Sequence, residues 1–433
     1  MIGLARIRSV SLSLSIFILT VSQIGCFCKA FSLSRSQPRG LSHDEIFKLA
    51  RKRFHWNEED NGIQLPMKGR VAVITGAAGG IGGELSKVVH RLGGTVVALD
   101  RNATGLEILR KNLIDGATSD ASDRILILPT NHEDLDSVKK SSEIIEFRFD
   151  KVDLLVNNAG LTYRENPMIS THGKDLAFTV NYLSHFLLTE RLLESLSKGG
   201  RIVHVTSTFH WMVDGSELLP DATIGSPVAY QSDPQLQSSK HVERSYANTK
   251  LAQIWHSRSI TKSLPDGAVC NSVCVCPTWA STGIAGDDAR SFLETYAFPV
   301  SDCGPGVTSA INGMLRTNEE LGDALDDGKS FVANSKIIDH ISFVVRGLLT
   351  SKLVKALGWR DFLANILSAV LLFGQKFTYK RFIIQETSPE SFEDAEKRVR
   401  FYEWSKMEVQ PWLKQKSSNS DKRKSGDIST LQK

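Results

Sequence analysis

The stretch Val71-Ala-Val-Ile-Thr-Gly-Ala-Ala-Gly-Gly-Ile-Gly82 decides the fold of this chain. It begins with four apolar residues, rich in valine and isoleucine, which predict a buried strand. The residues after Gly82 have helical spacing, and the glycines at 76, 80 and 82 allow a tight turn between the two elements. A strand that passes through a glycine-rich turn into a helix presents unpaired backbone N–H groups, which favours a phosphate-bearing ligand.

Short apolar runs separated by helical stretches continue from this point to about residue 335. The further runs expected to form strands are 95–99, 125–128, 154–157, 201–206 and 269–276. Continuous apolar strands that alternate with helices are typical of a parallel sheet covered on both faces. We therefore predict an α/β fold, a single doubly wound Rossmann domain with a parallel sheet over 68–335. Its chemistry should lie at the carboxyl ends of the strands.

Composition excludes several classes of protein. The 433 residues are 41% hydrophobic and 23% charged, which predicts a folded protein with a large core. The net charge is only +4, so nucleic acid is not expected as a partner. A mean hydropathy of -0.14 excludes a polytopic membrane protein. The six cysteines form no Cys-x-x-Cys pair, so no metal site is expected.

The sequence outside 68–335 divides into segments of different composition. We assign 1–40 to a targeting or anchor segment, 41–67 to a linker with a short helix, 336–386 to a basic and apolar helical insertion, 387–414 to a C-terminal helix and 415–433 to a disordered tail. The domain over 68–335 is thus expected to carry an N-terminal targeting or anchor segment and a C-terminal helical extension.

The N-terminal segment predicts the location of the protein. Arg6 and Arg8 precede an uncharged stretch, Ser9–Cys28, which is the layout of a signal peptide or signal anchor. This predicts the secretory pathway and the endoplasmic reticulum membrane, and whether the segment is removed stays open. Residues 31–39 are led by phenylalanine and rich in serine and arginine. They resemble the second part of a two-part plastid targeting sequence, so the plastid is the alternative location.

The second predicted strand leads to Asp100 and Arg101. A carboxylate at this position can accept both ribose hydroxyls of NAD and would repel the 2′-phosphate of NADP. The guanidinium of Arg101 could neutralise that phosphate. The sequence therefore favours NAD and leaves NADP open.

A tyrosine and a lysine, Tyr246 and Lys250, are four residues apart in a stretch with helical apolar spacing, so they share one helix face. A phenol has an ordinary pKa near 10, and a cation held beside it favours the phenolate. The pair is therefore a candidate general acid and base.

Taken together, the motifs resemble the short-chain dehydrogenase/reductase family over about 68–335. In chain order they are TGxxxGxG at 75–82, NNAG at 157–160, Asn181, Ser207, YxxxK at 246–250, and Pro277 followed by Thr282. The phrases at 181–189 and 246–252 are most similar to the retinol dehydrogenase and WW-domain oxidoreductase branch. The chain departs from the pattern at Thr278, where the family has glycine, and at Asn131, where it has aspartate.

The resemblance implies a hydride transfer between a nicotinamide cofactor and an alcohol or carbonyl group. Tyr246 would exchange a proton with the substrate oxygen, and Lys250 would bind the nicotinamide ribose. Ser207 would hydrogen-bond the substrate oxygen, and Asn181 would hold a water that relays the proton. The implied cofactor-binding residues are Gly76, Gly80, Ile81, Gly82, Asp100, Arg101, Asn131, Asn158, Ala159, Gly160, Tyr246, Lys250, Pro277 and Thr282.

The substrate and partners follow from the same resemblance and from the segments outside the domain. We expect an apolar substrate of the retinoid, steroid or lipid aldehyde type, contact with a membrane surface, and a homodimer paired through the helices that carry Asn181 and Tyr246. The first alternative is a catalytically silent nucleotide-binding scaffold of the same fold, which has no need of the four catalytic residues present here. The second is a plastid pigment-precursor reductase, whose relatives carry extra cysteines near the substrate.

Overall fold

The structure, a computed structural model, describes residues 39–57, 65–115, 121–162, 168–218, 242–274, 304–326, 330–335, 379–389 and 395–413. Most of the expected targeting segment, 1–38, lies outside these ranges, as do 336–378 of the expected insertion and the tail from 414 onward. Over the described ranges, no helix is both long and apolar enough to cross a membrane.

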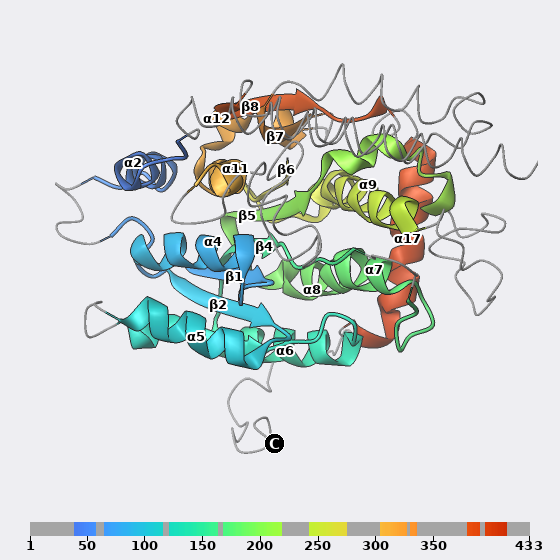
Figure 1. The fold of residues 1–433 in the computed structure, drawn as a ribbon, viewed down its shortest axis with the longest axis horizontal. Coiled ribbons are helices and arrows are strands. Elements are labelled where there is room, and N and C mark those ends of the chain that lie inside the picture. Colours follow the sequence, from blue (N-terminus) through green and yellow to red (C-terminus); the bar gives the residue numbers. More distant parts are fainter. Residues whose placement is uncertain are drawn as a thin grey trace, which may run out of the picture.

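The described strands form one eight-stranded sheet in the order β3-β2-β1-β4-β5-β6-β7-β8 (Figure 1). Their bounds are β1 Val71–Thr75, β2 Thr95–Asp100, β3 Ile125–Pro129, β4 Val152–Asn157, β5 Leu196–Thr206, β6 Val269–Cys274, β7 Ser330–Ser335 and β8 Tyr379–Glu386. All neighbouring pairs are parallel except β7 and β8. The chain reverses its direction of winding between β1 and β4, which confirms the doubly wound α/β class and marks a ligand crevice at their carboxyl ends.

Helices cover both faces of this sheet. One face packs against α2 His43–Arg53, α4 Gly80–Arg91, α5 Ala103–Ile114 and α11 Thr308–Leu315. The other packs against α6 Leu135–Arg148, α8 Ser184–Leu192 and α9 Val242–Ile260. The shorter helices are α7 Leu176–Phe178, α12 Asn318–Leu321 and α13 Asp323–Asp326, with turns η1 Ser122–Arg124, η2 Thr179–Leu183, η3 Leu193–Ser195, η4 Thr208–Met212, η5 Ser216–Leu218, η7 Thr261–Ser263 and η9 Pro305–Val307.

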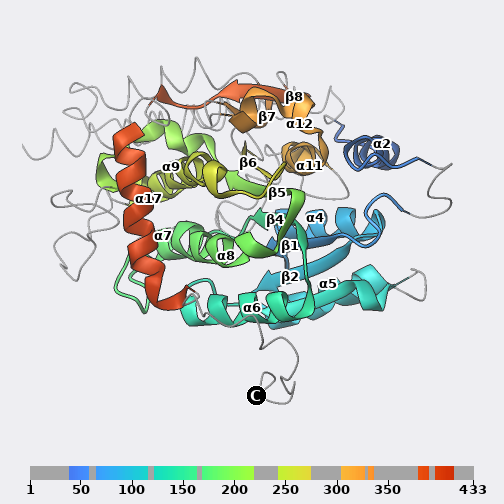
Figure 2. The same ribbon diagram turned by 180° about the vertical axis from the view of Figure 1, so that it is seen from behind.

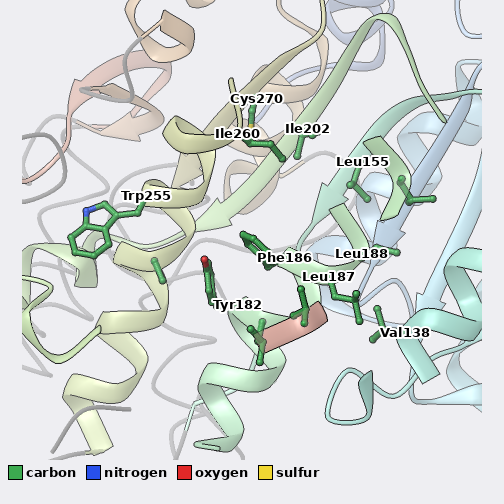
Figure 3. Packing of buried hydrophobic residues seen from close by; sticks show 14 of the residues in the cluster. Val138, Leu155, Tyr182, Phe186, Leu187, Leu188, Ile202, Trp255, Ile260 and Cys270 are labelled. Atoms are coloured by element: carbon green, nitrogen blue, oxygen red, sulfur yellow. The ribbon is translucent and has the colours of Figure 1, made fainter. Parts of the chain in front are cut away.

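The strands are apolar throughout because both faces are buried. In β1, Ala72 and Ile74 join the core on one face, whereas Val71 and Val73 join the core on the other. Figure 3 shows the second of these cores, in which Phe186 of α8 lies near Tyr182, and its ring also packs against His256 of α9. Complete burial of β1 fixes the position of the turn that follows it.

Two strands differ from the sequence prediction. β7 lies inside the predicted domain but was not among the expected strands, and β8 occupies residues expected to be helical. The prediction of a helix over 336–386 is therefore wrong at Tyr379–Glu386. Ile383 and Ile384 favour extended structure, and the charged Lys380 and Arg381 are tolerated because β8 is an edge strand that pairs only with β7.

A long C-terminal helix, α17 Ala395–Val409, is followed by the turn η11 Gln410–Trp412 and lies within the range expected for such a helix. It crosses the layer of helices formed by α6, α8 and α9 (Figure 2). The ring of Phe401 stacks on Tyr182 at a centroid distance of 5.1 Å, and the hydroxyls of Tyr182 and Ser405 lie 2.8 Å apart. The helix is thus part of the core rather than an appendage.

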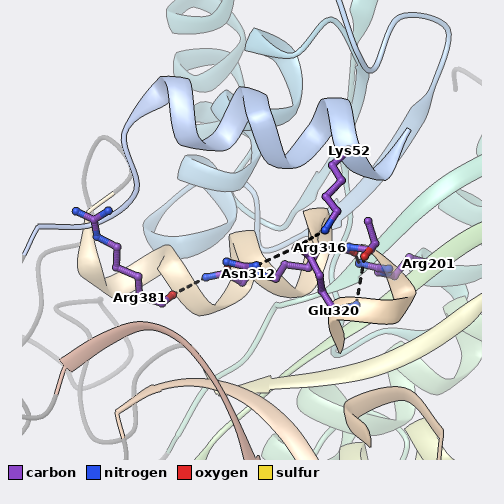
Figure 4. A network of polar contacts seen from close by, with 7 residues as sticks. Lys52, Arg201, Asn312, Arg316, Glu320 and Arg381 are labelled. Carbon is purple, nitrogen blue, oxygen red and sulfur yellow. Dashed lines mark hydrogen bonds and ion pairs between the residues drawn. The ribbon is translucent and has the colours of Figure 1, made fainter. Parts of the chain in front are cut away.

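A polar network ties β5 and α2 to the end of α11 (Figure 4). Arg201 of β5 is fully buried, and its guanidinium donates to the carbonyls of Gly313 at 2.9 Å and Arg316 at 2.6 Å. These carbonyls lie at the helix end, where backbone acceptors lack helical partners. The Lys52 ammonium lies 2.8 Å from the Glu320 carboxylate, so α2 is held at the same place.

Candidate active site

The glycine-rich turn is shaped by backbone positions that a side chain would disrupt. Gly76 has a φ of +66° and Gly80 a φ of +51°, both in the left-handed region that favours glycine. A Cβ atom added at Gly82 would lie 2.2 Å from the carbonyl oxygen of Gly76. The start of α4 therefore packs directly on the end of β1, with its N-terminus facing the crevice edge.

Thr75 connects this turn to the one that follows β4. Its Oγ1 accepts the backbone N–H groups of Asn158 and Ala159, each at 2.9 Å. The side-chain amide of Asn158 donates to the Thr75 carbonyl at 2.8 Å. A Cβ atom at Gly76 would lie 2.9 Å from that amide nitrogen. The predicted residues Gly76, Asn158 and Ala159 are thus brought together.

His185 of α8 links Thr75 to Asn181. Its Nδ1 lies 3.0 Å from the Asn181 carbonyl oxygen, and its Nε2 lies 2.9 Å from Thr75 Oγ1. A carbonyl only accepts, so Nδ1 carries the proton and Nε2 accepts from the threonine hydroxyl. Burial holds the pKa of His185 well below its usual value, which keeps the ring neutral.

Asn181 lies in the π-helical turn η2, a geometry that often marks functional positions. Its side-chain oxygen accepts the N–H of Leu161 at 2.8 Å, and its side-chain nitrogen donates to the Leu161 carbonyl at 2.9 Å and to Thr249 Oγ1 at 3.1 Å. Asn181 therefore joins the loop after β4 to helix α9.

The main-chain oxygen of Asn181 is also occupied. It accepts from Nδ1 of His185 at 3.0 Å and from Nε2 of Gln253 at 2.8 Å. A carbonyl oxygen has two lone pairs, and both are used here. The water that the resemblance assigns to Asn181 has no acceptor left at this carbonyl.

Tyr246 and Lys250 lie together on α9, as their spacing predicts. The Lys250 ammonium is 5.3 Å from the centroid of the Tyr246 ring. It donates to the Val205 carbonyl at 3.0 Å and to Gln253 Oε1 at 3.2 Å, and the side chain is buried. The lysine is therefore anchored to the end of β5.

Ser207 follows β5 directly and begins the turn η4. Its carbonyl accepts from Nδ1 of His210 at 2.7 Å, and the next ring along the turn, Phe209, lies edge-on to Tyr246 at 5.6 Å. The structure thus places Ser207, Tyr246 and Lys250 in one region at the carboxyl end of β5. That region can position a substrate oxygen between a hydroxyl and a phenol.

The predicted ribose and adenine residues lie beyond the glycine-rich turn. Asp100 accepts the N–H of Ala78 at 3.1 Å and the N–H of Asn102 at 2.9 Å, so its carboxylate is oriented by that turn. Each oxygen keeps lone pairs for a further donor. Arg101 is exposed, and Asn131 follows β3, where its side-chain oxygen accepts the N–H of Glu133 at 3.2 Å.

Two predicted residues, Pro277 and Thr282, lie outside the described residues. Sequence reasoning missed Thr75, His185 and Gln253 as parts of the site. The available signal for Gln253 was its position three residues after Lys250 on a helix whose neighbouring residues are apolar. In the part of the chain that the structure describes, no three His, Cys, Asp or Glu side chains gather to hold a metal ion.

The sequence is similar to those of several known proteins over part of its length. Nodulation protein G of Rhizobium meliloti is 31% identical over 145 residues, which cover 33% of this chain and 56% of the relative. The chloroplastic short-chain dehydrogenase TIC 32 A of Brassica napus is 29% identical over 227 residues, which cover 49% of this chain and 63% of the relative. The chain thus spans less than two thirds of the length of these two curated relatives.

A solved structure shares the fold over most of the chain. The crystal structure of an uncharacterised protein from Mycobacterium paratuberculosis superposes with a TM-score of 0.50 at 18% identity, covering 82% of this chain and 97% of that one. A family model described as short chain dehydrogenase matches residues 70–213, from the start of β1 to the end of the turn after β5. Over residues 70–213, the chain is therefore similar to the short-chain dehydrogenase family.

Proposed function

We propose that the protein is an NAD(P)-dependent oxidoreductase that transfers hydride between a nicotinamide cofactor and an alcohol or carbonyl group. The observation that carries this proposal is the gathering of Tyr246, Lys250 and Ser207 at the carboxyl end of β5. The family match over residues 70–213 supports it.

The residues at the ends of β1, β2 and β4 fit a dinucleotide. Gly76 and Gly82 have no side chain to cover the backbone beside the start of α4. A Cβ atom added at either position would collide with the chain. An anion is favoured at such a helix N-terminus. The oriented carboxylate of Asp100 suits the ribose hydroxyls of NAD, which we propose as the preferred cofactor.

The proposed cofactor contacts continue on both sides of that turn. The full set is Gly76, Gly80, Ile81, Gly82, Asp100, Arg101, Asn131, Asn158, Ala159, Gly160, Tyr246, Lys250, Pro277 and Thr282. The chemistry that a bound nicotinamide supplies is hydride exchange with the substrate carbon.

The chain's own residues handle the proton and the substrate oxygen. Tyr246 donates or accepts the proton, and the Ser207 hydroxyl hydrogen-bonds the same oxygen. The ammonium of Lys250, held against Val205, favours the phenolate because an opposite charge stabilises an ionised group. Asn181 fixes the loop after β4 against α9.

For the substrate we propose an apolar alcohol or aldehyde of the retinoid, steroid or lipid type. The similarity of 181–189 and 246–252 to the retinol dehydrogenase branch supports this class. The ring of Phe209 beside Tyr246 gives the proton-transfer group an apolar neighbour. A substrate with an apolar body next to its reacting oxygen suits these surroundings.

Of the two locations that the sequence leaves open, we propose the plastid. The serine- and arginine-rich residues 31–39 support it, as does the similarity to the chloroplastic dehydrogenase of Brassica napus. The proposed contact with a membrane surface rests on 1–40 and 336–378, which lie almost entirely outside the described residues.

The homodimer expected from the resemblance would use the helices that carry Asn181 and Tyr246. In this chain α17 occupies part of that surface, since Phe401 packs on both Tyr182 and Trp255. Pairing through these helices would require α17 to move.

The proposed function is tested with the full chain and a panel of retinaldehydes, ketosteroids and fatty aldehydes. We expect the chain to oxidise NADH in the presence of at least one of these carbonyls. Isothermal titration should show tighter binding of NADH than of NADPH, and the reverse order would contradict the role given to Asp100. Nucleotide binding without hydride transfer in either direction would favour the catalytically silent scaffold.

The glycine-rich turn offers a matched pair of substitutions. Gly82→Ala forces a Cβ atom to within 2.2 Å of the Gly76 carbonyl oxygen, whereas Gly79 has no atom within 4 Å of such a position. We expect Gly82→Ala to lower the free energy of unfolding by about 1–3 kcal/mol. It should also weaken NADH binding at least tenfold, about 1.4 kcal/mol. Gly79→Ala should change neither value, and equal binding by the two variants would contradict the packing argument.

A further inference from the structure

Gln253 lies three residues after Lys250 on α9, and its side chain is only 1% exposed. Its Oε1 accepts from the Lys250 ammonium at 3.2 Å, and its Nε2 donates to the Asn181 carbonyl at 2.8 Å. One amide group therefore bridges the lysine on α9 and the π-helical turn η2. No motif in the sequence draws attention to this residue.

The orientation of this amide is fixed by its two partners. An ammonium only donates and a carbonyl only accepts. Turning the amide over would place its NH₂ group against Lys250 and its oxygen against the Asn181 oxygen. Both contacts would then be repulsive, so the observed orientation is the one that satisfies both partners.

The bridge restrains the direction of the lysine. The Lys250 side chain has four rotatable bonds. Without the hydrogen bonds to Gln253 and Val205 it could adopt several rotamers. The Val205 carbonyl and Gln253 Oε1 hold the ammonium from two sides, 5.3 Å from the Tyr246 ring centroid. The electrostatic stabilisation of the Tyr246 phenolate by the Lys250 ammonium depends on that distance.

The bridge also completes the coordination of Asn181. The His185 ring supplies one donor to the Asn181 carbonyl, and Gln253 supplies the second. An amide is a poor carrier of protons compared with water, because passing a proton through it would require the unfavourable imidic acid tautomer. The side chain thus connects Lys250 with Asn181 by hydrogen bonds without offering a proton path between them.

We propose that Gln253 is a positioning residue for the reaction, which clamps the Lys250 ammonium beside Tyr246 and closes the Asn181 carbonyl to a relay water. The catalytic role given to Gln253 rests on the proposed function. The clamp itself is a property of the folded chain and is measurable without cofactor or substrate.

The first experiment follows the ionisation of Tyr246 in the cofactor-free protein. Tyrosinate absorbance is titrated against pH in the parent chain, and the same titration of Tyr246→Phe identifies the contribution of this phenol. Gln253→Met, which keeps the length of the side chain and removes both hydrogen bonds, should move this titration to higher pH. An unchanged titration would overturn the clamp, whether or not the protein proves to be an oxidoreductase.

Two further variants separate positioning from folding. Ser259→Ala removes a hydrogen bond elsewhere on α9, from the Ser259 hydroxyl to the Trp255 carbonyl at 2.8 Å, about two and a half helical turns from Lys250. It should leave the Tyr246 titration in place. Gln253→Glu keeps the size and places a carboxylate beside the ammonium, which offsets its charge and should again move the titration to higher pH. This variant keeps the test decisive if Gln253→Met does not fold.

The second experiment measures turnover once hydride transfer is found. For alcohol oxidation, in which the Tyr246 phenolate accepts the proton, we expect Gln253→Met to lower kcat about tenfold, with the rising limb of the pH profile of kcat moved to higher pH and KM within twofold. Ser259→Ala should keep the parent profile. A parent chain without hydride transfer would reject the proposed function but leave the titration result standing. An active parent with an unchanged profile in Gln253→Met would reject the positioning role.

Discussion

Tyr246→Phe is expected to lower kcat by roughly 10²–10⁴-fold, the range that a general acid or base contributes. The substitution keeps the ring against Phe209 and beside the Lys250 ammonium, so packing is preserved. Only the hydroxyl that exchanges the proton is lost. The measurement is steady-state hydride transfer on the best carbonyl of the panel.

A second tyrosine gives the control for this result. Tyr402→Phe on α17 also removes one hydroxyl, which in the parent donates to Glu190 Oε1 at 2.7 Å. It should cost about 1 kcal/mol of stability and leave kcat within twofold. NADH affinity should be similar in the parent and both variants. Full turnover by Tyr246→Phe would mean that another group exchanges the proton.

The second large effect concerns the stability of the protein in acid. Burial lowers the pKa of five of the buried histidines among the described residues: His132 and His210 to about 4, His256 to about 3, and His185 and His204 well below the usual value. Below about pH 6.5 the histidines of the unfolded chain take up protons that the folded protein excludes. The free energy of unfolding therefore falls as the pH decreases from about 6.5 toward 4.

The size of this fall is set by linkage. Each buried histidine lowers the free energy of unfolding by up to about 1.4 kcal/mol per pH unit within that window. Several such groups together remove an amount comparable to the whole stability of a typical domain. We expect acid unfolding between about pH 6 and 4, measured by urea denaturation at a series of pH values.

One histidine separates this explanation from general acid sensitivity. Neither ring nitrogen of His256 has a hydrogen-bond partner among the described residues, and the ring packs 4.7 Å from Phe186. His256→Phe should reduce the slope of stability against pH by up to about 1.4 kcal/mol per unit between pH 4 and 6. The exposed His43→Gln should leave the slope unchanged. Glu45 and Glu320, whose pKa values are lowered by their hydrogen bonds and ion pairs, contribute only at the acid end of this window and below it, because the carboxyls of the unfolded chain take up protons at about pH 4.3.

The parts of the site that sequence reasoning predicted are those with local signals. The turn from Gly76 to Gly82 follows from glycine spacing next to an apolar strand, and the Tyr246–Lys250 pair follows from helix periodicity. The positions of the first six strands and the parallel class of the sheet were accessible in the same way, because apolar runs alternate with helices. Each of these features depends on residues only a few positions apart.

The parts that it missed depend on contacts between distant segments. Gln253 reaches a carbonyl 72 residues away in the chain, and Thr75 meets His185 across 110 residues. Strand β8 forms because β7 offers an open edge, which no pattern within Tyr379–Glu386 reveals. Basic residues on an edge strand resemble those of a membrane-surface helix, and only the pairing distinguishes the two.

The position of α17 in the chain has a consequence for biosynthesis. A ribosome completes η2, α8 and α9 long before it reaches Phe401 and Trp404. Until then, the sides of the Tyr182 and Trp255 rings on which Phe401 packs in the finished protein are not covered by α17. Exposed apolar surface on an incomplete domain is prone to aggregation and is recognised by chaperones. The nascent chain should therefore depend on a chaperone until α17 emerges.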